Sequence, residues 1–138
     1  AKQTSGPTIQ SIDYVLKENL GNSLTTFAYK VSKSTQTYAM IKSQLGAEQT
    51  DKLVSQELDL AIEKYQSEWN ANLAESYSDF LTSDELNSLY YNGRNSPYYK
   101  KRVKFHKDVG LSMREKSSGL LTKVVSESML KSFKQLPK

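Results

Sequence analysis

A run of aliphatic and aromatic residues spaced three and four apart, between positions 48 and 80, most constrains the fold. On an α-helix such residues share one side, so they form a continuous apolar stripe. The stripe predicts a long helix from about 48 to 80 that must pack along its whole length. Its members are Leu58, Ile62, Tyr65, Trp69, Leu73, Tyr77 and Phe80. The other face, which we expect to be solvated, carries Asp59, Glu63, Glu68, Glu75 and Asp79.

Four further helices are predicted from apolar spacing and stop signals, over residues 8–20, 23–45, 84–91 and 97–133. Gly and Pro are scarce and Val and Ile are few, so a β-sheet has little support. Weak helix formers at 32–37 predict a kink in the second helix, and residues 117–119 predict a bend in the last. The expected fold is all-α, with about five helices, the long amphipathic ones antiparallel in a bundle or an open V.

The other helices also have predicted inward stripes. In the first, the expected members are Ile9, Ile12, Leu16 and Leu20. In the second, they are Phe27, Val31, Tyr38, Ile41 and Leu45. In the last, they are Val103, His106, Val109, Met113, Leu120, Val124 and Phe133. We expect residues 8–135 to be a single domain and residues 1–7 to be a loose N-terminal segment.

Residues 80–101 contain the sharpest helix boundaries. Thr82 or Ser83 fits an N-cap, and acidic residues at 84 and 85 suit the positive end of the helix dipole. Asn92-Gly93 suits a helix end, and Pro97 suits the first position of the next helix. These signals predict architecture rather than chemistry.

The same stretch resembles a family of small secreted or periplasmic helical proteins of Gram-negative bacteria, known as a domain of unknown function. The matching positions are Phe80, Thr82, Glu85, Leu86, Leu89, Tyr90, Tyr91, Ser96, Pro97 and Lys101. Two features depart from the family pattern: residues 92–95 separate the aromatic pair from Ser-Pro, and Tyr99 replaces a glycine. The resemblance implies an all-α fold and an extracytoplasmic location. It implies no activity.

Charge is distributed unevenly along the chain. Residues 1–93 carry 7 basic and 12 acidic side chains, whereas residues 94–138 carry 12 basic and 3 acidic ones. The chain has no Cys, which excludes disulfides, thiolate zinc sites and Cys nucleophiles. Its start, Ala-Lys-Gln, fits signal-peptide cleavage, loss of an initiator Met or trimming. Together with the resemblance, it leads us to expect a periplasmic or secreted protein.

Few residues suggest catalysis. His106 is the only histidine, and on its stripe it is expected in the core rather than as a ligand. Ser128 and Lys131 have the spacing of a serine–lysine pair, but no further hydrolase motif accompanies them. The carboxylates of 57–79 are expected to be mostly a wet face. The predictions are therefore no enzyme, no catalytic residues, no metal and no cofactor.

Binding is the predicted role, in a chaperone-like or adaptor protein that holds a protein or peptide on an aromatic surface between helices. Tyr and Arg are enriched at interface hot spots. The predicted partner-binding residues are Trp69, Tyr90, Tyr91, Arg94, Tyr98 and Tyr99. The alternative is a nucleic-acid or anionic-membrane surface, because basic and aromatic residues alternate over 98–107. Its residues would be Lys100, Lys101, Arg102, Lys104 and Lys107. A homodimer through the last helix is also possible.

Overall fold

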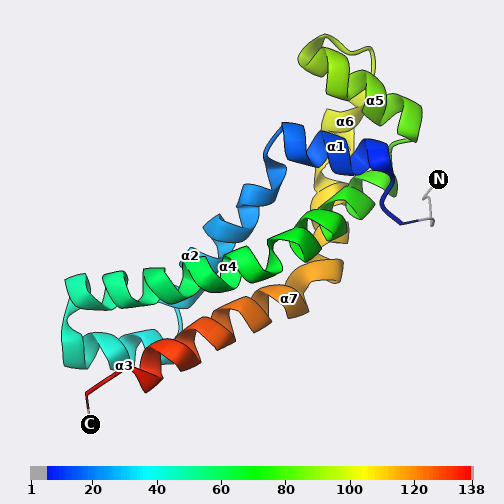
Figure 1. Cartoon of the computed structure of the whole chain (residues 1–138). Coiled ribbons are helices and arrows are strands. Elements are labelled where there is room, and N and C mark those ends of the chain that lie inside the picture. Colours follow the sequence, from blue (N-terminus) through cyan, green and yellow to red (C-terminus); the bar gives the residue numbers. More distant parts are fainter. Residues whose placement is uncertain (1–5, 138) are drawn as a thin grey trace. The chain divides into compact units, whose positions relative to one another are not determined.

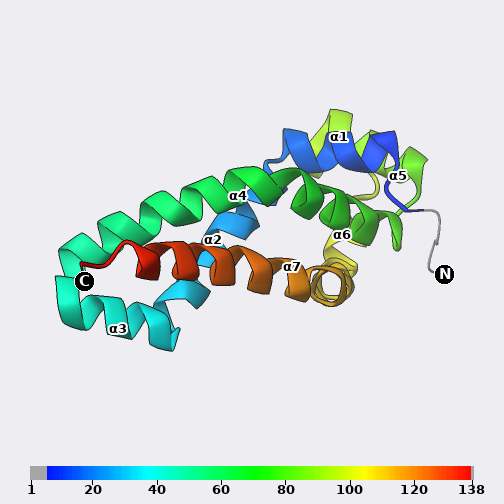
Figure 2. The ribbon, with the colours of Figure 1, turned by 60° about the horizontal axis from the view of Figure 1, so that its bottom comes forward.

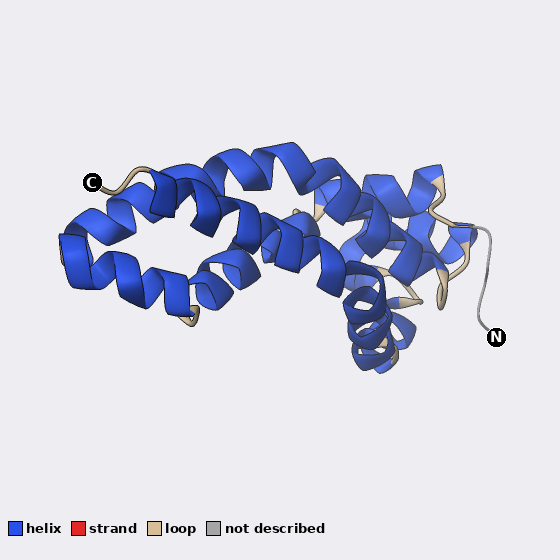
Figure 3. Ribbon diagram, turned by 90° about the horizontal axis from the view of Figure 1, so that it is seen from below, coloured by secondary structure: helices blue, strands red, loops and turns tan. Residues whose placement is uncertain are grey.

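The computed structural model describes residues 6–137, and every regular element in that range is helical (Figure 3). The all-α fold class is confirmed, with seven α-helices in the described residues where about five were expected. Most of the loose segment predicted at 1–7 lies outside the described residues. The α-helices are α1 (Ile9–Lys17), α2 (Ser23–Lys33), α3 (Gln36–Leu45), α4 (Ala47–Ser78), α5 (Ser83–Asn92), α6 (Tyr99–Lys104) and α7 (His106–Lys134). Short 3₁₀ helices are η1 (Leu20–Asn22) and η2 (Gly93–Asn95).

The second expected helix breaks where its weak helix formers lie. α2 ends at Lys33, and Thr35 then adopts an extended conformation as the N-cap of α3. Its hydroxyl accepts a hydrogen bond from the backbone N–H of Tyr38 at 3.1 Å. A side chain that satisfies an unpaired helix-start N–H makes the break favourable.

α7 has no break at 117–119, because the helix is continuous through Gly119. The break instead falls at Phe105, between α6 and α7, where the Phe105 ring stacks on Phe80 with centroids 5.5 Å apart. Ser117 is buried and accepts a hydrogen bond from Asn72 of α4 at 3.1 Å. Tertiary contacts therefore overrode local propensity at both places.

Within residues 8–135, contacts gather in two compact units. The first unit comprises residues 6–21 and 67–118, and the second comprises residues 22–66 and 119–137. Each unit combines segments distant in sequence, since α4 and α7 contribute to both.

The first unit is built around α1, α5 and α6. α1 packs against α5 (Figure 2). The rings of Tyr14 and Tyr77 meet edge to face with centroids 5.6 Å apart. The buried apolar residues of this unit are Tyr14, Val15, Trp69, Leu73, Ala74, Tyr77, Leu81, Leu86, Leu89, Val109 and Met113.

In the second unit, α3 turns into α4 at Gly46, and the two helices run antiparallel (Figure 1). Gly46 has φ 81°, a left-handed conformation that favours glycine. Tyr38 of α3 donates a hydrogen bond to Asp51 of α4 across this turn. The buried apolar residues of this unit are Leu24, Ala28, Ile41, Val54, Leu58, Ala61, Ile62, Leu120, Val124, Val125 and Met129.

The expected stripes were correct for α4 and partly wrong elsewhere. Leu58, Ile62, Trp69, Leu73 and Tyr77 are buried as predicted. In α1, however, the buried positions are Ser11, Tyr14 and Val15, and α2 buries Leu24, Ala28 and Ser32. In both helices, therefore, the side that packs against other helices is not the side of the predicted stripe. Expected core residues that are exposed instead are Ile9, Leu16, Phe27, Val31, Val103, His106 and Phe133.

Candidate functional site

The predicted aromatic surface is only partly present. Trp69 is 3% exposed, so it belongs to the core of the first unit and is not available to a partner. Tyr91 is the most exposed of the tyrosines at 71%, and its ring meets Tyr90 edge to face with centroids 4.9 Å apart. Lys17 of α1 lies over the Tyr90 ring. Of the remaining predicted residues, Tyr98 and Arg94 are exposed and Tyr99 is half-buried.

The basic segment divides into inward and outward side chains. Lys101 forms an ion pair with Glu85 at 2.7 Å. Arg102 donates hydrogen bonds to the hydroxyls of Tyr14 at 2.7 Å and Tyr77 at 3.1 Å. Burial raises the pKa of Tyr77 despite the nearby guanidinium, so the hydroxyl stays neutral and accepts the bond. These two cations therefore stabilise the fold.

Glu85 connects the start of α5 to α6. It accepts from the backbone N–H of Thr82 at 2.8 Å, while the Thr82 hydroxyl accepts from the N–H of Glu85 at 3.2 Å. This is a reciprocal capping box. Burial acts to raise the pKa of Glu85, but Lys101 and the backbone of Thr82 outweigh it and lower the pKa.

The rest of the turn is also held by structural hydrogen bonds. The hydroxyls of Ser88 and Ser96 lie 2.7 Å apart. Ser96 also accepts from the backbone N–H of Tyr98 at 3.1 Å. These hydrogen bonds connect α5 to the start of α6 across the turn.

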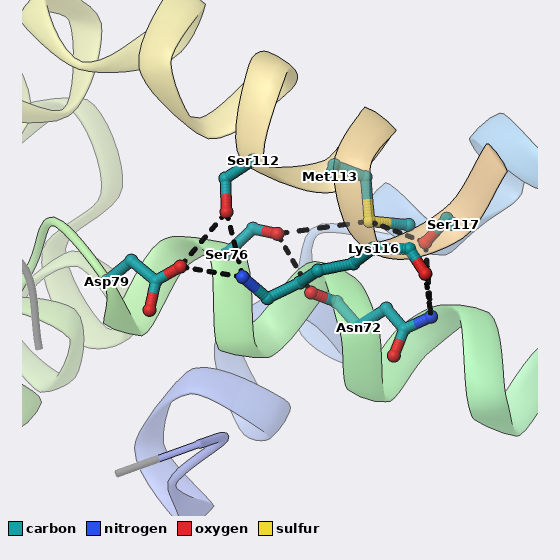
Figure 4. Close-up of polar contacts among 7 residues, drawn as sticks. All are labelled: Asn72, Ser76, Asp79, Ser112, Met113, Lys116 and Ser117. Atoms are coloured by element: carbon teal, nitrogen blue, oxygen red, sulfur yellow. Dashed lines mark hydrogen bonds and ion pairs between the residues drawn. The ribbon is translucent and has the colours of Figure 1, made fainter. Parts of the chain in front are cut away.

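A buried polar cluster joins α4 to α7 in the first unit (Figure 4). Asp79, expected on the wet face, is only 3% exposed. It accepts from the Ser112 hydroxyl at 2.9 Å and pairs with Lys116 at 2.8 Å. Lys116 also donates to Ser112 at 2.9 Å. A carboxylate, an ammonium and a hydroxyl that satisfy one another in a closed interior form a structural link rather than an open nucleophile.

The other residues considered for chemistry are not assembled into a site. Ser128 is fully buried and donates to the backbone oxygen of Val124 at 2.7 Å. Lys131 is exposed, and its Nζ lies 3.9 Å from Oε2 of Glu127. His106 is exposed, which corrects its predicted place in the core. In the part of the chain that the structure describes, no three His, Asp or Glu residues are grouped to hold a metal ion.

A candidate site is an apolar groove between α3 and the C-terminal part of α7, in the second unit. Its volume is about 340 Å³. Met40 is 45%, Leu130 55% and Phe133 40% exposed, which leaves much apolar surface in water. The lining residues are Thr35, Thr37, Met40, Val125, Ser126, Met129, Leu130 and Phe133.

Carboxylates of the second unit are held by hydrogen bonds that involve α4. Asp59 accepts from the hydroxyl of Tyr29 at 2.6 Å, and Glu57 accepts from Gln135 at 2.7 Å. The hydrogen bond to Asp51 raises the pKa of Tyr38 to about 12. Glu127 of α7 accepts from Lys64 and Tyr65 of α4, each at 3.1 Å.

Two lysines are close in sequence to residues that line the groove. α2 and α3 contain lysines and no acidic residue. Lys33 precedes Thr35 by two residues, and Lys134 follows Leu130 by one helical turn. Both lysines are exposed.

Sequence reasoning missed the groove. A single stripe was assigned to the last helix, yet Leu121, Val125, Met129 and Leu130 widen its apolar side beyond what one neighbour can cover. This unusually wide apolar side was the feature of the sequence that could have indicated the groove. The identity of the uncovered residues depends on how α3 packs, which the sequence did not reveal.

No family model, curated protein or solved structure matched this chain. Among residues 6–137, no helix is both long and apolar enough to cross a bilayer.

We predict that Glu85→Gln destabilises the protein at neutral pH and has little effect in acid. Because the folded-state pKa is lowered, the stabilisation is complete above the ordinary glutamate pKa of about 4.3 and disappears as the pH falls through the folded value. Thermal unfolding followed by circular dichroism from neutral pH to about pH 3 measures this loss. Asp84→Asn removes a charge from the same helix start without breaking the ion pair. If Glu85→Gln and Asp84→Asn change the stability equally at every pH, the Glu85–Lys101 ion pair is not the source of the stabilisation.

We predict that Asp79→Ala costs about 3 kcal/mol of unfolding free energy, since it leaves the Lys116 ammonium without its buried partner. Urea unfolding followed by the fluorescence of buried Trp69 measures it. Glu68→Ala, which removes an exposed carboxylate from the same helix, is the control. The double variant Asp79→Leu, Lys116→Met should recover most of the loss. A cost no larger than that of Glu68→Ala would show that the pair contributes nothing.

Proposed function

We propose that the protein is a non-enzymatic helical binding protein, of adaptor or chaperone-like type, that holds an amphipathic segment of a partner protein. The observation that carries the proposal is the exposed apolar groove lined by Met40, Met129, Leu130 and Phe133. Its volume lies at the low end of the range for ligand pockets, about 300–1,000 Å³, so it suits a few large side chains.

The composition of the groove favours a peptide over a rigid small molecule. Methionine side chains are flexible and polarisable, and they adapt to partners of different shape. Two helices with a depression between them can receive the apolar side of a third. Thr35, Thr37 and Ser126 add hydroxyls to the lining.

Charge complementarity selects the kind of segment. Lys33 and Lys134 are exposed and close in sequence to lining residues, and the carboxylates at 51, 57, 59 and 127 are hydrogen-bonded to side chains. An amphipathic helix with acidic residues beside its apolar stripe would meet these cations. We therefore propose an acidic amphipathic helix as the ligand.

An extracytoplasmic location is part of the proposal, and the family resemblance supports it. Release of the native protein by osmotic shock, together with periplasmic markers, is the expected result. Retention of the protein with cytoplasmic markers would overturn this part of the proposal and leave the groove unaffected.

We predict that a labelled peptide with leucines at helical spacing and glutamates on its other positions binds the protein. The double variant Leu130→Ser, Phe133→Ser should weaken binding about tenfold or more, because it removes two apolar contacts. Fluorescence anisotropy titration measures the dissociation constant, and circular dichroism checks that the fold is retained.

Two controls make the test specific. Leu60→Ser removes a side chain of the same unit that is 60% exposed and does not line the groove, so it should leave binding unchanged. A peptide with lysines in place of glutamates should bind less tightly, and the difference should narrow with salt. If the Leu60→Ser variant and the Leu130→Ser, Phe133→Ser variant bind the peptide equally well, the groove is not the binding site. Equal binding of both peptides would overturn the acidic ligand.

A further inference from the structure

A second exposed surface lies on the first unit, along α6 and the start of α7. Lys101 and Arg102 point into the unit, whereas Lys100, Lys104 and Lys107 are exposed. None of the three exposed lysines forms an ion pair with another described residue. Lys101 already pairs with Glu85, the nearby half-buried acid, while Lys104 lies over the ring of Phe105.

Apolar side chains are interleaved with these lysines. Val103 is 51% and Leu111 48% exposed, and Tyr98 is 37% exposed. Phe105 connects the two helices: its backbone N–H bonds to the oxygen of Lys101, and its own oxygen accepts from the N–H of Val109. Lys100, Val103 and Lys104 lie three and four residues apart on α6, and Lys107 and Leu111 lie four apart on α7, away from the buried Val109 and Ser112.

The surface is strongly positive. From 94 to 114, the exposed cations outnumber the one exposed carboxylate, that of Asp108. The exposed cations are Arg94, Lys100, Lys104, Lys107 and Arg114. Exposed lysines attract anionic lipid headgroups, and aliphatic side chains beside them can enter the headgroup boundary.

We propose that this strip, which we call the α6–α7 strip (Lys100, Val103, Lys104, Lys107 and Leu111), docks the protein on an anionic lipid surface. Lysines would contact the headgroups, Val103 and Leu111 would enter the boundary below them, and Tyr98 would lie at headgroup level. Single-stranded nucleic acid fits less well, because its binding relies on aromatic stacking. Here Phe105 is already stacked on Phe80, and the exposed apolar side chains of the strip are aliphatic.

Co-sedimentation with vesicles tests the proposal. The protein should bind phosphatidylcholine vesicles that contain phosphatidylglycerol, should not bind pure phosphatidylcholine, and should dissociate as salt is raised. Each lysine near an anionic surface contributes roughly fivefold to partitioning, so Lys100→Gln, Lys104→Gln, Lys107→Gln should reduce binding on the order of 100-fold.

Matched variants separate this strip from general positive charge. Lys30→Gln, Lys33→Gln, Lys42→Gln removes the same charge from exposed sites of the second unit and should reduce binding far less. Val103→Ser, Leu111→Ser should weaken binding while keeping its salt dependence, because only the apolar contribution is lost. Circular dichroism and Trp69 fluorescence confirm that each variant is folded.

Three results would overturn the proposal. The first is equal loss of binding in both lysine triples, which would make the attraction non-specific. The second is unchanged vesicle binding in Val103→Ser, Leu111→Ser, which would remove the insertion. The third is binding of a single-stranded oligonucleotide through the same lysines with no binding to anionic vesicles. None of these results bears on the α3/α7 groove, whose residues lie in the other unit.

Discussion

The first unit depends on one carboxylate, that of Glu85, which acts on two elements at once. It completes the capping box at the start of α5 and pairs with Lys101 of α6. Because Lys101 is held, its neighbour Arg102 is directed to the hydroxyls of Tyr14 and Tyr77. These contacts fix which face of α6 points into the unit, so Lys100, Val103 and Lys104 are exposed to solvent. The α6 lysines of the α6–α7 strip are therefore exposed because Lys101 and Arg102 are the cations that point inward.

Hydrogen bonds from α4 have the corresponding role in the second unit. Acidic side chains at 51, 57 and 59 accept from residues of α3, the C-terminal segment and α2, while Lys64 and Tyr65 hold Glu127 of α7. Solvent-exposed pairs of this kind each contribute little to stability. Their effect is on placement: they hold Tyr29 of α2, Tyr38 of α3 and Glu127 of α7 against α4.

The fold class and the α4 stripe could be predicted because they depend on local periodicity. Leu58, Trp69 and Tyr77 recur so regularly that any packed helix would bury them. The phase of α1 could not be predicted, because Ile9 and Leu16 make as regular a stripe as the buried set at 11, 14 and 15. The burial of Asp79 and the groove at Met40 and Phe133 could not be predicted either. Each depends on what a distant segment covers, and the sequence does not show that.

Serine explains how a chain with a hydrophobic fraction of only 37% forms closed helical units. Ser32, Ser76 and Ser128 are buried, and their hydroxyls donate to backbone oxygens three or four residues earlier in their own helices. A hydroxyl satisfied in this way is buried without the penalty of a missing hydrogen bond, and its small size lets helices approach closely. The core therefore needs fewer large apolar residues than a composition argument assumes. Leucines at 16, 60, 111 and 130 stay exposed all the same, because the burial of a leucine depends on what packs over its side of the helix.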